Sequence, residues 1–241
     1  IDISPYKHNS KGGSGPPSYV HTLPMPDPFR GKYRGQKALN GYIDDLKEIL
    51  LSIKKQGKQL SAFVVEPIMG CGGQVILPDE FLKRSFELVR DAGGICIADE
   101  VQIGFGRVGT DFWGFETAYV EPDIVTMGKS MGNGHPLSVV VTTKDIAEKF
   151  NNGMEYFNSF GGNPVSCAVG KAVLRAVEEE NMQQNANKIL WRKRCFTLNS
   201  RKAVWAKASS LRSIRRLAKH RTHFLSRGPR LSPHRAKVRP L

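Results

Sequence analysis

The sequence predicts an α/β fold with a mostly parallel sheet, and three observations support this prediction. Short runs of apolar residues recur along the chain, around Phe63, Ile97, Val125 and Val140. Amphipathic segments with helical spacing alternate with these runs. Near-continuous apolar strands are typical of sheets that pack against helices on both sides. We therefore expect helices on both faces of the sheet.

The first half of the chain is predicted to contain a loop, a helix, a strand and a helix in turn. Residues 1–36 are rich in Gly, Pro and Ser, which favour loops. Residues 41–56 place isoleucine and leucine at helical spacing. Residues 60–67 contain a short apolar run that stops at Glu66 and Pro67, so they predict a strand. Residues 78–94 carry an apolar line on one helical face and end in glycines.

The second half is predicted to add three strands and two helices. Apolar runs predict strands within residues 94–100, 122–129 and 137–143. Residues 143–150 predict a short helix. Residues 163–180 predict a longer helix with a proline close to its start, where proline is well tolerated.

Charge divides the chain into two parts. Residues 191–241 contain 16 Lys and Arg and no Asp or Glu, which leaves 20 basic and 22 acidic residues in 1–190, a net charge of −2. We therefore predict one domain over 1–190 and a basic tail over 191–241 that is disordered or comes from an aberrant reading frame. A genuine extension that binds nucleic acid or an acidic membrane surface is the alternative.

Composition also limits the compartment and the kind of site. No apolar run approaches the roughly 20 residues that a membrane span needs, so no membrane partner is expected. The four cysteines form no CxxC pair and show no metal-ligand spacing, so reduced thiols, no metal and an intracellular location are expected. The first residue is not Met, so the true start is expected upstream. Mitochondrial and cytoplasmic locations both stay open. The cysteines are Cys71, Cys96, Cys167 and Cys195.

Three ionisable residues stand at or just after the ends of predicted strands, namely Glu66, Asp99 and Lys129. Because ligands bind beyond the carboxyl ends of strands in open α/β sheets, we expect these residues at one site. Lys129 lies among glycines and a serine, which let a flat ligand approach the backbone closely. A lysine whose pKa is lowered forms a Schiff base with a carbonyl compound. A surface lysine in a turn is the alternative.

Asp99 needs a partner because it directly follows a buried strand, where an unpaired carboxylate is costly. A protonated pyridine nitrogen would serve, since an aspartate at that position keeps the ring an electron sink. The alternative is an aspartate that caps the next segment of the chain.

Four segments together resemble one enzyme family, the class-III pyridoxal-phosphate-dependent aminotransferases. They are "FVVEPIMGCGGQVILPDEFL", "GGICIADEVQIGFGRVG", "PDIVTMGKSMGNGHPLS" and "YFNSFGGNPVSCAVG", in the order and spacing of that family. With "PDPFRGKYRG" near the start, the resemblance is greatest to the alanine–glyoxylate aminotransferase 2-like subgroup. That subgroup includes phospho-lyases acting on phosphoethanolamine and phosphorylated hydroxylysine. The resemblance covers residues 1–190 and implies the large domain of a fold type I pyridoxal-phosphate transferase, incomplete at both ends.

The resemblance implies a role for each matching residue. Lys129 would bind the cofactor pyridoxal 5'-phosphate as a Schiff base and move a proton at the substrate's alpha carbon. Asp99 would pair with the pyridine nitrogen, Val101 would pack on one ring face, and Gln102 would reach the phenolic oxygen. Ser159 would contact the cofactor phosphate of a neighbouring subunit, which implies a homodimer.

Other assignments remain open between function and structure. The resemblance implies that Glu66 pairs with a substrate-binding arginine, whereas a solvated strand end is the structural alternative. Val101 would otherwise be ordinary core. Arg107 is either a substrate anchor or a structural partner, and His135 is expected to satisfy a local hydrogen bond.

The function expected from these residues is transamination of an amino-group substrate through Lys129. A phospho-lyase that eliminates phosphate from phosphoethanolamine or phosphohydroxylysine is the alternative. An inactive fragment and a basic nucleic-acid-binding protein are further alternatives, although nucleic acid is not the expected partner.

Overall fold

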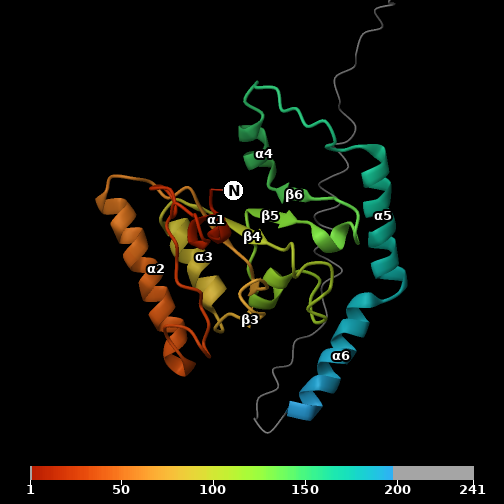
Figure 1. Cartoon of the computed structure of the whole chain (residues 1–241), viewed down its shortest axis with the longest axis horizontal. Coiled ribbons are helices and arrows are strands. Elements are labelled where there is room, and N and C mark those ends of the chain that lie inside the picture. The colour runs from red at the N-terminus through yellow and green to blue at the C-terminus, as the bar shows by residue number, and fades with distance from the viewer. Residues whose placement is uncertain (1, 198–241) are drawn as a thin grey trace, which may run out of the picture. The chain divides into compact units, whose positions relative to one another are not determined.

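The structure is a computed structural model that describes residues 2–197. Figure 1 shows how its elements are arranged. The helices are α1 (Pro5–Asn9), α2 (Ala38–Lys55), α3 (Phe81–Asp91), α4 (Lys144–Phe150), α5 (Pro164–Glu179) and α6 (Met182–Thr197). The strands are β1 (Ala62–Val65), β2 (Ile68–Met69), β3 (Val75–Ile76), β4 (Ile95–Asp99), β5 (Ile124–Met127) and β6 (Val139–Thr142). Short 3-10 turns are η1 (Gly35–Lys37), η2 (Gly114–Ala118) and η3 (Lys129–Met131).

The four predicted strands form one sheet in the order β1-β4-β5-β6. Strands β1, β4 and β5 run parallel, and β6 runs antiparallel to β5. The mostly parallel α/β sheet expected from the sequence is thus confirmed. Strands β2 and β3 pair in a separate antiparallel ribbon, and α1 lies within residues 1–36, which were predicted to be loop. Both differences involve very short elements, which carry too few residues for a periodic pattern.

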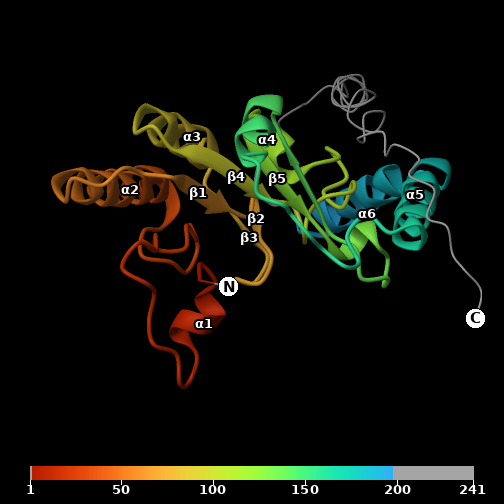
Figure 2. The same ribbon diagram turned by 90° about the horizontal axis from the view of Figure 1, so that it is seen from above.

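Helices α3 and α2 cover one face of the sheet, as Figures 1 and 2 show. Helix α3 contacts β1 and β4, and α2 packs against α3 from outside. Alternate residues of β4 point into this core, because successive side chains of a strand face opposite sides. The core includes Tyr42 and Ile43 from α2, Phe81, Phe86 and Val89 from α3, and Cys96 and Ala98 from β4.

The opposite face of the sheet is only partly covered by the described residues. Val64 pairs with Ile97 in register and shares this face with Val140. Val64 is 42% exposed and Val140 is 63% exposed. Asp99 pairs with Thr126 on the same side of the sheet. The predicted aspartate therefore lies on the open face rather than in the core under α3.

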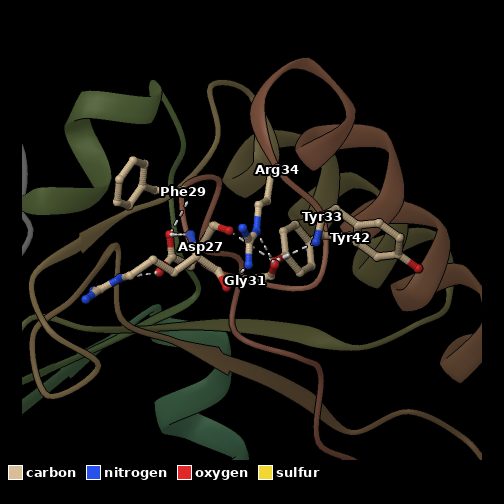
Figure 3. Close-up of polar contacts among 7 residues, drawn as sticks. Asp27, Phe29, Gly31, Tyr33, Arg34 and Tyr42 are labelled. Atoms are coloured by element: carbon tan, nitrogen blue, oxygen red, sulfur yellow. Dashed lines mark hydrogen bonds and ion pairs between the residues drawn. The ribbon is translucent and has the colours of Figure 1, made fainter.

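A hydrogen-bonded turn holds the N-terminal segment against α2 (Figure 3). Asp27 Oδ1 accepts the N–H groups of Phe29 and Arg30 at 2.8 and 3.0 Å. The Tyr42 hydroxyl donates to the Asp27 carbonyl at 3.2 Å. A Cβ on Gly31 would lie 2.5 Å from that carbonyl oxygen, so only glycine fits there without a shift. This turn explains the "PDPFRGKYRG" stretch as structural.

The predicted boundary at residue 190 falls inside α6, which continues to Thr197. Residues 198–241 lie outside the described part, so the predicted basic tail stays a prediction. Among residues 2–197 no helix is long and apolar enough to cross a membrane. Cys71, Cys96 and Cys167 are free thiols, as expected.

Candidate active site

Lys129 begins the turn η3 directly after β5, with Gly128 between the strand and the lysine. Its φ is +36°, an uncommon value for a residue with a side chain. The N–H groups of Gly132 and Asn133 both donate to the Lys129 carbonyl at 3.1 Å and hold this conformation. Left-handed conformations of this kind cost about 1–3 kcal/mol and persist where surrounding contacts fix them. The exposed Lys129 side chain is thus held at the carboxyl end of the sheet by its own backbone.

Asp99 is the last residue of β4, the strand parallel to β5. Its Oδ1 accepts the Val101 N–H at 3.0 Å. Asp99 therefore caps the start of the segment that follows β4, which is the alternative role that the sequence left open. Within residues 2–197 no hydrogen bond uses Oδ2, so one carboxylate oxygen remains able to bind a cationic group.

Val101 lies between the strand end of Asp99 and the lysine loop. A Cβ on Gly128 would sit 3.6 and 3.7 Å from the two Val101 methyl carbons. These are ordinary van der Waals distances, so Val101 packs beside the backbone that leads into Lys129. The structure thus brings the predicted carboxylate, apolar side chain and amine to one edge of the sheet.

Gln102 and Glu66 meet at the turn between β2 and β3. Glu66 Oε2 accepts the Gly70 N–H at 2.6 Å. Gln102 Nε2 donates to Cys71 Sγ at 3.6 Å. A Cβ on Gly70 would lie 2.9 Å from Gln102 Cγ and 3.1 Å from Glu66 Oε2, so the two side chains share this glycine. Glu66 therefore stabilises the turn between β2 and β3 in this structure. Its pairing with a substrate-binding arginine stays a prediction.

Ser159 lies in the exposed segment between α4 and α5. No hydrogen bond within residues 2–197 joins it to Asp99, Gln102 or Lys129. Arg107 Nε donates to Ser130 Oγ at 2.7 Å, next to Lys129. His135 Nε2 lies 2.8 Å from Ser166 Oγ on α5, so His135 has a hydrogen-bond partner as expected, but the partner is 31 residues away rather than local.

The sequence analysis missed Glu100, the residue between Asp99 and Val101. Its side chain is 1% exposed and accepts the N–H groups of Gly114 and Phe115, each at 2.9 Å. Burial raises the pKa of Glu100 to about 7, while the two hydrogen bonds oppose that rise. An available signal was the second carboxylate at the end of an apolar strand, since an acid there needs buried donors.

The residues at this edge fit pyridoxal phosphate on chemical grounds. A lysine amine suits its aldehyde, a carboxylate suits a protonated pyridine nitrogen, and valine methyl groups suit a ring face. An amide, from Gln102, suits a phenolic oxygen. Gly128 adds no side chain to the backbone beside Val101.

The mostly parallel sheet, with a lysine and an aspartate at neighbouring strand ends, has the arrangement expected of a pyridoxal-phosphate-dependent transferase of fold type I. The chain belongs to the class-III aminotransferase family, because the family "Aminotransferase class-III" matches residues 3–201.

Curated relatives agree with this assignment. The chain is 47% identical over 192 residues to "Alanine--glyoxylate aminotransferase 2-like" of Drosophila melanogaster, covering 77% of this chain and 39% of the relative. It is 42% identical over 208 residues to "Alanine--glyoxylate aminotransferase 2, mitochondrial" of Homo sapiens, covering 78% and 39%. The chain therefore spans about 39% of the length of these relatives.

Solved structures show the same fold. A phospholyase from Arthrobacter in complex with phosphoethanolamine superposes with a TM-score of 0.69 at 36% identity, covering 80% of this chain and 49% of the other. An ornithine aminotransferase from Toxoplasma gondii, described as partly occupied by PLP at its active site, gives 0.57 at 33% identity, with coverages of 63% and 34%.

Proposed function

We propose that this chain carries the lysine half-site of a pyridoxal-phosphate-dependent enzyme that acts on an amino-group substrate. The observation that carries the proposal is the position of Val101 beside Gly128, where an added Cβ would lie 3.6 Å from the nearer Val101 methyl carbon. It places the strand end of Asp99 next to the loop of Lys129, across two parallel strands. The cofactor named for the Toxoplasma structure supports pyridoxal phosphate as the ligand.

Each residue has a defined task in this proposal. When bound, pyridoxal phosphate supplies an electron sink for charge that develops on the substrate's alpha carbon. Lys129 Nζ would hold the cofactor covalently and, when its amine is free, would remove and return a proton at the substrate's alpha carbon. The Asp99 carboxylate would hold a proton on the ring nitrogen. Val101 would exclude water from one ring face, and Gln102 would orient the ring through its phenolic oxygen.

Transamination and phosphate elimination share the removal of this proton, so both are candidate reactions. The names of the Drosophila and human relatives favour transamination. The phosphoethanolamine bound to the Arthrobacter structure favours elimination, in which phosphate leaves from the carbon next to the alpha carbon. We place transamination first and retain the phospho-lyase as the second candidate.

A substrate assay separates the two reactions. Alanine with glyoxylate should yield pyruvate and glycine if the enzyme is a transaminase. Phosphoethanolamine should yield phosphate, ammonia and acetaldehyde if it is a phospho-lyase, since the eliminated enamine hydrolyses. Because this chain spans part of its relatives' length, the assay is run with the chain and with a full-length relative as the positive control. If neither reaction proceeds in the chain while the control is active, this chain is an inactive portion.

Borohydride reduction tests the covalent link itself. Reduction in the presence of pyridoxal phosphate converts a lysine–cofactor double bond into a stable amine, which peptide mapping locates. Label on Lys129 is the expected result. Label spread over surface lysines, or confined to another lysine, would contradict the proposed role.

We also propose that the chain functions as a homodimer. The segment that carries Ser159, together with the last residue of α4, exposes large apolar side chains that are 67% to 82% exposed, namely Phe150, Met154, Tyr156, Phe157 and Phe160. Clustered exposed aromatics are typical of protein interfaces. A second copy that covers this segment would place Ser159 near a neighbouring site, and sedimentation analysis measures the assembly.

An intracellular location, mitochondrial or cytoplasmic, is proposed from the residues and from the human relative's name. Imaging of a tagged chain in cells distinguishes the two compartments.

A further inference from the structure

Glu100 is the one buried acidic residue of the active-site edge that the proposed function leaves without a task. It lies between Asp99, proposed to hold the ring nitrogen, and Val101, proposed to pack on the ring. Its side chain points into the protein and is 1% exposed. A buried carboxylate is costly unless donors satisfy it, and here two backbone N–H groups do so.

Those two donors come from the far end of a loop that begins at Glu100 itself. The chain leaves β4, runs through residues 101–113, and returns at Gly114 and Phe115. The Glu100 side chain therefore joins the two ends of this loop, which we call the closure loop (residues 101–113). The backbone of Glu100 is fixed as well, because its N–H donates to the Thr126 carbonyl at 2.9 Å and its carbonyl accepts the Gly104 N–H at 2.9 Å.

The close approach at Gly114 shows how little room this arrangement leaves. A Cβ there would lie 2.7 Å from Ile103 Cγ2, 3.1 Å from Pro67 Cβ and 3.2 Å from Glu100 Oε1. Only glycine lets the backbone N–H come this near to the carboxylate. The loop is stiffened further by edge-to-face contacts among Phe105, Phe112 and Trp113.

The closure loop carries three groups that touch the site. Val101 and Gln102 begin it, and Arg107 at its far side donates to Ser130 next to Lys129. A single buried carboxylate thus determines where the ring-packing side chain, the amide and the support of the lysine turn lie.

We propose that Glu100 is a positioning residue, whose ionised side chain closes residues 101–113 and sets Val101, Gln102 and Arg107 around the cofactor. This inference rests on the proposed function. An ionised carboxylate offers an acceptor oxygen to each N–H group, whereas a protonated one turns a hydroxyl towards one of them. The charged groups that act on Glu100 are Asp99 and Glu116, both acidic, so both oppose its ionisation.

The closure is therefore expected to depend on pH near neutrality. The burial that raises the pKa of Glu100 to about 7 places this change within a measurable range. Below that pH one N–H of the pair Gly114 and Phe115 loses its acceptor. Above it the ionised carboxylate accepts both hydrogen bonds, while the burial of its charge lowers the free energy of unfolding of the whole chain.

The test compares the wild-type chain with Glu100→Gln, and with Glu87→Gln as a control that makes the same chemical change on the exposed side of α3. The affinity for pyridoxal phosphate is measured from the absorption of the lysine-bound cofactor, from about pH 5 to about pH 9. We expect Glu100→Gln to bind about tenfold more weakly and to lack a step near pH 7, since small displacements of positioning groups have large effects. Glu87→Gln should behave as wild type.

A second measurement needs neither the variant nor the cofactor. The amide NMR signals of Gly114 and Phe115 in the wild-type chain should shift together with a midpoint near pH 7. Absence of that shift, or a Glu100→Gln chain with unchanged affinity and pH profile, would overturn the inference. If no chain binds pyridoxal phosphate, the proposed function fails, and the two amide signals alone decide whether Glu100 closes the loop.

Discussion

The strand-end site and the segment between α4 and α5 are built in opposite ways. Asp99, Val101 and Lys129 are held by backbone hydrogen bonds and contacts that begin and end within the described chain. The segment over 151–163 instead exposes its aromatic side chains, and its hydrogen bonds are local. The difference agrees with our proposal that Asp99, Val101 and Lys129 form one half of a site and that a second copy of the chain covers the exposed segment.

The largest expected effect concerns Lys129 at the strand-end site. Lys129→Ala should abolish the absorption of the lysine-bound cofactor, because within residues 2–197 Lys129 is the lysine that follows β5 at the edge where Asp99 lies. The matched control is Lys144→Ala on α4, a lysine paired with Glu148 on the exposed helix surface. Absorption retained in Lys129→Ala would show that another lysine binds the cofactor.

A pair of phenylalanine substitutions measures how differently the two regions contribute to folding. Phe86 is 1% exposed beneath the sheet, whereas Phe157 is 78% exposed in the segment. Phe86→Ala should lower the free energy of unfolding by about 3–5 kcal/mol, as urea denaturation measures it. Phe157→Ala should change it by less than about 0.5 kcal/mol but weaken self-association in sedimentation. A large loss of stability in Phe157→Ala would show that the segment is packed within one chain.

The pH dependence of stability sharpens the comparison at the strand end. Because burial raises the pKa of Glu100 from 4.5 to about 7, the folded chain keeps a proton that the unfolded chain has already lost in this range. The free energy of unfolding should therefore fall as the pH rises from about 4.5 to about 7, by up to about 3 kcal/mol from this group. Glu100→Gln should remove that fall in urea denaturation at several pH values. An identical pH profile in the variant would contradict the burial of an ionisable Glu100.

The smallest effect concerns the junction between the segment and α5. Asn163 Oδ1 accepts the Ser166 N–H at 2.9 Å and caps the helix. Asn163→Ala should lower the free energy of unfolding by about 1 kcal/mol, whereas Asn163→Ser keeps an acceptor and should cost much less. Thermal unfolding of both variants measures the difference. Equal losses would show that the side-chain oxygen is not what stabilises this end of the helix.

The sequence was sufficient for the main elements of the sheet and for its class. The four strands and the helices α2, α3, α4 and α5 were predicted because each carries an apolar pattern long enough to show its period. Strands β2 and β3 were missed, since two residues have no period. Helix α6 was missed because its composition changes at Trp191, inside the helix.

The candidate site was predicted in part. Asp99 and Lys129 were identified from their positions at the ends of apolar strands. They lie at the same edge of the sheet because β4 and β5 pair in parallel. The hydrogen bond from Gly70 to Glu66 and the closure by Glu100 could not be predicted, because each joins groups whose approach depends on how a loop returns.

The sequence by itself determined the residue types at the strand ends, the α/β class and the family. Apolar periodicity and motif order are local properties of a chain, so they survive without coordinates. Only the tertiary structure decided that Val101 lies beside Gly128 and that Glu100 is buried against Gly114 and Phe115. Those facts depend on the path of the loops between strands, and a loop's path is fixed by packing against distant residues.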